Sequence, residues 1–189
     1  MDILLAAVSY AACAFGALLA ADFLTGVLHW AEDTWLAPGQ SPLLDRWVTN
    51  DNIEHHRSPG KIRAGHYWST NRVCIALAAG ATLVFAVAGV RAWEAYLVLA
   101  LLSQSNQIHL WAHTSRPPRV VGWLQKTGLL QSAKIHARHH KNPYASHFCT
   151  ITAFLNPMLD RTGFWRGLES IAVRLGANVH RATPARNGY

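Results

Sequence analysis

Charged residues are scarce in this chain of 189 residues. They make up 14% of it, and only ten are acidic, whereas apolar residues make up 51%. A soluble domain usually carries about 25% charged residues. The low charge content argues against an ordinary soluble protein and directs attention to the apolar runs.

Cysteine and several common enzyme motifs are also scarce or absent. Cys13, Cys74 and Cys149 lack the spacing of a metal site, so we expect free thiols and no disulfide framework. The chain has no Gly-rich phosphate loop, no CxxC motif and no paired nucleophile and base. These absences exclude the usual nucleotide-binding and nucleophile-dependent enzyme classes.

Long apolar runs are present, and they predict the fold class. The runs 3–28 and 73–90 are nearly free of charge, and a third, weaker one covers 92–112 and leads to His113. A spanning helix needs about 20 mostly apolar residues. We therefore expect one membrane domain over residues 1–189. Its fold would be all-α, with about three transmembrane helices and a helical, histidine-rich cap on the cytoplasmic face.

The basic residues orient these spans. Only Arg91 lies between the second and third spans, and the other sixteen Lys and Arg lie within 31–72 or after residue 113. The positive-inside rule makes that side cytoplasmic. We expect a multi-pass protein with its N-terminus outside and its C-terminus in the cytoplasm, in the inner membrane if the source is bacterial. A soluble helical bundle with a basic surface is the alternative.

Histidine is abundant, with eleven in the chain, and this topology brings nine of them to one membrane face. Imidazole is the commonest protein metal ligand near neutral pH, and one open catalytic ion keeps about three protein ligands. The nine predict two metals, or one metal with many supporting histidines. They are His29, His55, His56, His66, His109, His113, His136, His139 and His140.

Helical spacing groups several of these side chains. His109 and His113 are four residues apart, as are His29 and Asp33, so each pair shares a helix face. His136, His139 and His140 would share one face if their segment is helical. Asp33 is a further ligand candidate or an orienting acceptor.

Two other polar residues are candidates for the surroundings of the metals. Asp22 is an ionisable residue within a predicted span, and it would orient a ligand or bond Thr25 or a neighbouring span. Asn156 would contact a metal-bound water or cap a helix. His147 and His180 are left outside the site.

Five segments resemble the plasmanylethanolamine desaturase family of plasmalogen-forming membrane enzymes. They are residues 20–35 (AADFLTGVLHWAEDTW), 54–56 (EHH), 106–113 (NQIHLWAH), 136–140 (HARHH) and 148–156 (FCTITAFLN), followed by 163–169 (GFWRGLE). The related plant plastid phosphatidylglycerol trans-desaturase shares the histidine boxes. The plasmalogen branch has a histidine where His66 stands and the plastid branch lacks one, which favours the plasmalogen reading.

The resemblance implies an oxygen-dependent lipid desaturase with two iron ions held by the histidines above, together with Asp33. Dioxygen would be the co-substrate, and zinc would be a possible substitute in purified protein, because affinity alone selects poorly between divalent metals. The product would be the C1–C2 vinyl ether of a plasmanyl phospholipid. Its partners would be the membrane and an external electron donor, cytochrome b5-like or ferredoxin-like, with no nucleic acid.

Other functions stay open. They are an acyl-chain desaturase or hydroxylase of another phospholipid such as phosphatidylglycerol, a zinc-dependent membrane lipid hydrolase, and a haem-carrying electron-transfer protein. A haem would need two axial histidines inside facing spans, whereas these histidines lie in boxes at one edge.

Overall fold

The computed structural model of the chain describes residues 2–60 and 65–180. These residues contain helices and loops but no β-strand, which confirms the predicted all-α fold class. In chain order the helices are α1 (Ile3–Trp35), α2 (Pro42–Leu44), the π-helical turn η1 (Asp45–Thr49), α3 (Asn50–Arg57), α4 (Tyr67–Val87), α5 (Trp93–Ser103), α6 (Ser105–Ala112), α7 (Arg119–Thr127), α8 (Ala133–His136), α9 (Leu155–Arg161) and α10 (Phe164–Arg174).

Helix α1 is the longest element of the described residues, and it continues beyond the predicted membrane span 3–28. A side-chain oxygen of Asp2 accepts a hydrogen bond from the backbone N–H of Leu4, which caps the helix start. The apolar first half is exposed, whereas the last turns carry buried side chains, among them His29, Trp30 and Asp33. The helix includes His29 and Asp33, as their predicted shared face requires, and these last turns lie beyond the apolar run because they carry polar side chains that the rest of the protein buries.

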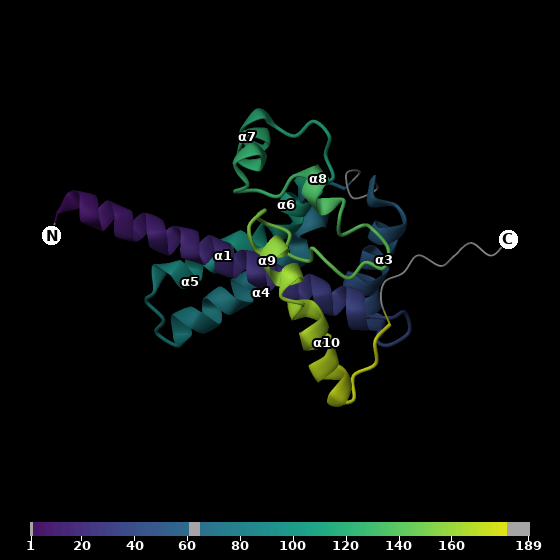
Figure 1. Ribbon diagram of the computed structural model, residues 1–189. Coiled ribbons are helices and arrows are strands. Elements are labelled where there is room, and N and C mark those ends of the chain that lie inside the picture. The colour runs from purple at the N-terminus through teal and green to yellow at the C-terminus, as the bar shows by residue number, and fades with distance from the viewer. Residues whose placement is uncertain (1, 61–64, 181–189) are drawn as a thin grey trace.

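Within residues 2–60 and 65–180, two helices are long and apolar enough to cross a membrane, and they correspond to the first two predicted spans. They are α1 and α4, and only 6% and 11% of their most apolar stretches are buried within the protein. Apolar helix surface that no protein covers is suited to contact with lipid. Figure 1 shows the N-terminal half of α1 projecting from the other helices, with the α4–α5 pair beside it.

The third predicted span is not one continuous helix. It is divided into α5 and α6 at Gln104, where φ is −103° and ψ is 3°. The Gln104 side chain bonds both the Ser103 hydroxyl and the Tyr67 phenol of α4. Polar side chains at this level satisfy one another locally instead of extending the apolar run. With eleven residues, α5 is too short to span a bilayer alone.

The hydrophobic core lies where the last turns of α1 meet α9, α10 and the segment 146–152. Trp30, Phe148, Cys149, Leu159 and Trp165 form one buried cluster, and Ala21, Ile108 and Ile151 form a second. The segment 146–152 contributes to both clusters although it belongs to no helix or strand. This core holds the inner ends of α1 and α6 in place, and those ends carry histidines.

Candidate metal centre

The structure gathers eight of the nine predicted histidines, together with Asp33, into two groups of side chains able to hold a metal ion. Within each group, one candidate ligand atom from every residue lies within 4.8 Å of the others. The five-histidine group is His55, His109, His113, His136 and His140. The Asp33 group is His29, Asp33, His56 and His139.

In the Asp33 group, three imidazoles converge on one carboxylate. Oδ1 of Asp33 lies 2.9 Å from Nε2 of His56 and accepts a 2.9 Å hydrogen bond from the Asn52 amide. Oδ2 lies 3.2 Å from Nε2 of His139 and 3.5 Å from Nε2 of His29. All four members of the group are buried.

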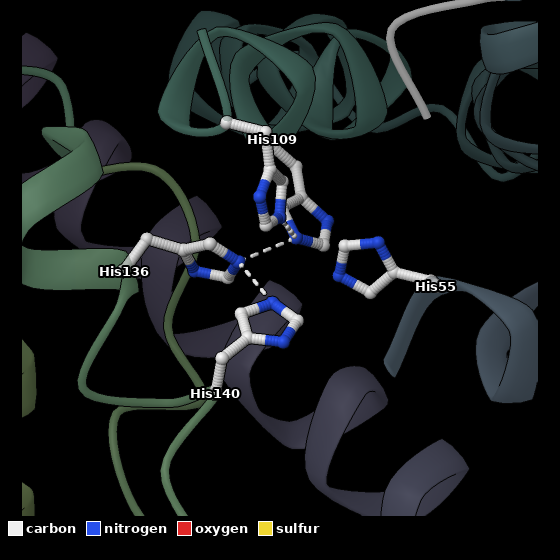
Figure 2. Close-up of side chains that lie close together, drawn as sticks. His55, His109, His136 and His140 are labelled. Carbon is white, nitrogen blue, oxygen red and sulfur yellow. Dashed lines mark hydrogen bonds between the residues drawn. The ribbon is translucent and has the colours of Figure 1, made fainter. Parts of the chain in front are cut away.

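In the five-histidine group, the Nε2 atoms approach one another directly. Nε2 of His136 lies 2.8 Å from Nε2 of His109 and 3.0 Å from Nε2 of His140. Nε2 of His113 lies 3.3 Å from that of His109. Figure 2 shows the rings of His109 and His140 meeting at His136, with His55 approaching from α3. Nitrogen ligands about 2.1 Å from one ion are themselves about 3 Å apart, so these separations fit a shared metal.

The buried polar atoms that lack hydrogen bonds lead to the same conclusion. They include Nε2 of His29, His55 and His139 and Oδ2 of Asp33. Burying a polar atom without a partner is costly. A cation bound among these atoms would satisfy them together.

The electrostatics of the centre favour the neutral form of three imidazoles of the five-histidine group. Burial, together with the neighbouring imidazoles, holds the pKa of His55 and of His136 well below the ordinary value. The same causes lower the pKa of His140 to about 2. An imidazole must be deprotonated to bind a metal, so these three side chains are ready ligands at neutral pH.

The two groups are adjacent and share their sequence segments. His55 and His56 are consecutive residues of α3 but belong to different groups. The rings of His56 and His140 are 5.1 Å apart between centroids, and those of His29 and His109 are 5.4 Å apart. Two ions held here would therefore be neighbours.

Backbone carbonyls orient two members of the Asp33 group. Nδ1 of His29 lies 3.1 Å from the carbonyl oxygen of Phe148, and Nδ1 of His139 lies 3.0 Å from that of Ser146. A carbonyl only accepts, so each ring carries its proton on Nδ1 and leaves Nε2 free for a metal. A metal-ligating histidine commonly donates its other N–H in this way.

The structure corrects the predicted arrangement of 136–140. These three histidines do not share one face, because α8 ends at His136 and the chain continues in tight turns. His136 and His140 enter the five-histidine group, whereas His139 enters the Asp33 group. Tight turns have a shorter period than an α-helix, so the side chains diverge.

His66 lies outside both groups. It is exposed and occupies the N-cap position of α4, where its side chain makes no capping hydrogen bond. Its predicted ligand role stays a prediction.

The two predicted supporting residues, Asp22 and Asn156, are buried but do not contact the ligands. Asp22 accepts from the backbone N–H groups of Ile151 and Thr152 and from the Thr152 hydroxyl. Asn156 bonds both the N–H and the carbonyl of Cys149. Both side chains hold the segment 146–152, and the backbone carbonyl of Asp22 accepts a 2.8 Å hydrogen bond from the Thr25 hydroxyl, the partner named in one of the predicted alternatives. Their predicted role around the metals stays a prediction.

Sequence reasoning missed three contributors to the site. Asn52 binds Asp33, and the carbonyls of Ser146 and Phe148 bind histidines. Asn52 precedes His55 by only three residues, which is a local signal. No side-chain pattern marks a backbone carbonyl.

Comparison with known proteins identifies the family. The lipid desaturase domain matches residues 18–182. Plasmanylethanolamine desaturase 1 of Mus musculus is 30% identical over 87% of this chain and 65% of its own length. Plasmanylethanolamine desaturase of Myxococcus xanthus is 29% identical over 81% of this chain and 57% of its own length. The chloroplastic fatty acid desaturase 4-like 2 of Arabidopsis thaliana is 29% identical over 86% and 60%.

The chain therefore spans about 57% to 65% of the length of these relatives. No solved structure matches it. The family match covers most of the chain, including both ligand groups, and the predicted resemblance is confirmed. The chain belongs to the lipid desaturase domain family.

Proposed function

We propose that this protein is a membrane lipid desaturase that introduces the C1–C2 double bond of a plasmanyl phospholipid, which yields the vinyl ether of a plasmalogen. The observation that carries the proposal is the pair of adjacent ligand groups, one of five histidines and one of three histidines with Asp33. Two relatives named plasmanylethanolamine desaturase support the choice of lipid.

The depth of the centre favours a bond near the lipid headgroup. At about 1.5 Å per residue, His29 lies about 40 Å along α1 from Ile3. The hydrocarbon core of a bilayer is about 30 Å thick. If α1 spans from its N-terminal end, His29 and Asp33 lie at the far interface. The first carbons of an ether-linked chain lie at that level, whereas mid-chain carbons do not.

Iron fits the ligand set, because imidazole and carboxylate ligands suit it and protein side chains supply no oxidant for an alkyl chain. Two bound iron ions would supply the reduction of dioxygen to two waters, with two electrons, two protons and the two hydrogens removed from C1 and C2. The histidines would hold the ions. The carbonyls of Ser146 and Phe148 would orient His139 and His29, and the apolar core beside them would exclude water.

The electrons would come from an external donor, cytochrome b5-like or ferredoxin-like. His113 and His140 are the partly exposed members of the five-histidine group. Exposed basic residues flank the histidine segments, at Arg57, Arg138 and Lys141. They would attract an acidic donor from the cytoplasm, in line with the positive-inside orientation, the outside N-terminus and a multi-pass topology.

A second candidate is desaturation of an acyl chain. The chloroplastic fatty acid desaturase 4 relatives of Arabidopsis thaliana are 29% to 31% identical to this chain, as similar as the plasmanylethanolamine desaturases. The same centre would serve both reactions, since each removes two hydrogens from neighbouring carbons.

Mass spectrometry of total lipids from cells that express the protein separates these candidates. We expect an ether lipid to lose two hydrogens and gain an acid-labile vinyl ether, with a dependence on oxygen and iron. Loss of two hydrogens from an acyl chain would indicate the second candidate. A hydroxylated lipid, or a lipid cleaved without iron or a reductant, would refute both desaturase candidates.

Matched variants tie the product to the centre. His139→Ala removes a member of the Asp33 group and should abolish the product. His180→Ala changes an exposed histidine outside both groups and should retain it. Product formation by the His139 variant at the parent's rate would place the chemistry elsewhere.

A further inference from the structure

Asp160 lies outside both ligand groups, yet it bonds the segment that orients two of their histidines. We propose that Asp160 is a positioning residue for the Asp33 group. By holding His147, it sets the Ser146 carbonyl, which shares a peptide unit with the His147 N–H, against the ring of His139. The proposal rests on the metal centre of the proposed function and adds a residue that acts on one ion only.

The contacts of His147 with Asp160 are direct. The backbone N–H of His147 donates to Oδ1 of Asp160 at 3.2 Å. Nδ1 of the His147 ring lies 2.6 Å from Oδ2 of the same carboxylate. One side chain therefore holds both the backbone and the ring of a single residue.

His147 needs such a restraint because its backbone is left-handed, with a φ of 58°. A residue with a Cβ rarely adopts this conformation, which is disfavoured by contact with its own carbonyl. The carbonyls on either side of His147 reach His139 and His29, whose ring centroids are only 4.3 Å apart. A change of conformation at His147 would move the Ser146 carbonyl away from the His139 ring, whereas Asn156 holds the peptide unit of the Phe148 carbonyl through the Cys149 N–H.

The two ends of the segment 146–152 have different anchors. The downstream end is bonded by Asp22, by Asn156 and by Gln131, whose N–H donates to the Ile151 carbonyl at 2.7 Å. The upstream end, which carries the Ser146 carbonyl, is bonded by Asp160, whereas the Phe148 carbonyl shares a peptide unit with the Cys149 N–H that Asn156 bonds. Losing Asp160 would therefore free the carbonyl that orients His139 while the rest of the segment stays in place.

Helix α9 supplies anchors for both ends from one face. Asn156 and Asp160 are four residues apart on this helix, so they project side by side. They bind Cys149 and His147, which are two residues apart in the segment 146–152. Two side chains on one face of α9 therefore hold two nearby backbone N–H groups of the segment in place.

Zinc titration of the metal-stripped protein in detergent tests the proposal, since zinc avoids oxidation. The parent should bind two ions per chain. Asp160→Ala should lower the affinity for one of these ions about 10- to 100-fold, which is the usual effect of losing a group that orients a metal ligand. The affinity for the other ion should stay unchanged. Excess zinc should restore two ions per chain. His29→Ala removes a ligand and should lose that ion at every concentration.

Two further variants make the result interpretable. Asp45→Ala also removes a carboxylate bonded to a backbone N–H, that of Gly39, and should retain both affinities. Asp160→Asn keeps an acceptor for the His147 N–H but loses the charge beside the ring, so the affinity for one zinc ion should fall several-fold. This variant decides the question if the alanine variant fails to fold. Asp160 also lines a cavity of about 220 Å³, so the alanine variant leaves no sealed void.

Parental affinity for both ions in the Asp160 variants would overturn the proposal, and so would equal weakening of both ions. If the parent binds no zinc, the metal centre and this inference fail together. If the parent binds two ions but converts no lipid, the proposed reaction fails and the role of Asp160 stands or falls on the titration alone.

Discussion

Gly26 offers a direct test of the way in which α1 meets the segment that orients the histidines. A Cβ at this position would lie 2.6 Å from Sγ of Cys149, 3.1 Å from the Trp165 ring and 3.2 Å from the backbone nitrogen of Cys149. Such distances are shorter than contact distances between packed atoms, so Gly26→Ala must move the segment away from α1.

The magnitude follows from a comparison within the same helix. A Cβ at Gly16 would meet nothing within 4 Å. Both glycines lie inside α1, and replacing glycine by alanine in a helix interior gains about 1 kcal/mol. Overpacking costs about 1–3 kcal/mol. Gly16→Ala should therefore be neutral or stabilising, and Gly26→Ala should be less stable than Gly16→Ala by about 1–3 kcal/mol.

The assay is unfolding of the purified protein in detergent with increasing denaturant. Cys149→Ala removes the Sγ atom, so the double variant Gly26→Ala/Cys149→Ala should recover part of the loss, as coupled neighbours do. The Cys149 backbone and Trp165 stay in place, so recovery should be incomplete. Equal stability of the two single glycine variants would refute the close approach of α1 to Cys149.

Three more predictions concern the centre and its setting. Replacing single members of the histidine boxes by alanine should abolish desaturation without loss of membrane insertion, measured by lipid mass spectrometry and by membrane fractionation. The positions are His109, His113, His136, His139 and His140. If all five variants kept the parent's activity, the active site would lie elsewhere. In the metal-free protein, the lowered pKa of His140, about 2, means that the unfolded chain binds the proton first. The contribution of the neutral His140 to the free energy of unfolding should be fully present above about pH 6.5 and should decrease as the pH falls below that value. Denaturant unfolding of the protein in detergent at pH values from 8 to 5 measures this change. A rise in stability on acidification would contradict this sign. A reporter active only in the cytoplasm should work when fused after Tyr189, because sixteen of the seventeen Lys and Arg lie on the proposed cytoplasmic side. An active export-dependent reporter at the same position would reverse the topology.

Regular helices account for what the sequence could predict. His109 and His113 come together because both lie at the end of α6, and His29 and Asp33 come together on α1. Four-residue spacing places side chains on one face wherever the helix continues. The apolar runs located α1 and α4 for a similar reason, since length and hydropathy are local properties.

The division of the histidines into two groups could not be read from spacing. His55 and His56 point to different groups, and His139 separates from its neighbours because α8 ends at His136. Where a short helix ends depends on what it packs against, and that information lies in distant parts of the chain.

Asp22 illustrates the same limit for a supporting residue. A carboxylate within an apolar run was identified as functional, and it is fully buried. Its partners, Ile151 and Thr152, are 129 and 130 residues away. Nothing local specifies such a pairing, so its role became visible only in the folded chain.

The choice of backbone carbonyls to orient His29 and His139 has an electrostatic reason. Before a metal ion binds, a carboxylate in place of either carbonyl would add a second buried negative charge near Asp33, and burying an unpaired charge is costly. A carbonyl accepts the Nδ1 proton without adding net charge, so Asp33 stays the one anion in the two ligand groups of the described residues. The consequence is that ligand orientation depends on the conformation of 146–152. That conformation depends in turn on Asp160 at one end, and on the absence of a Cβ at Gly26 where the segment meets α1.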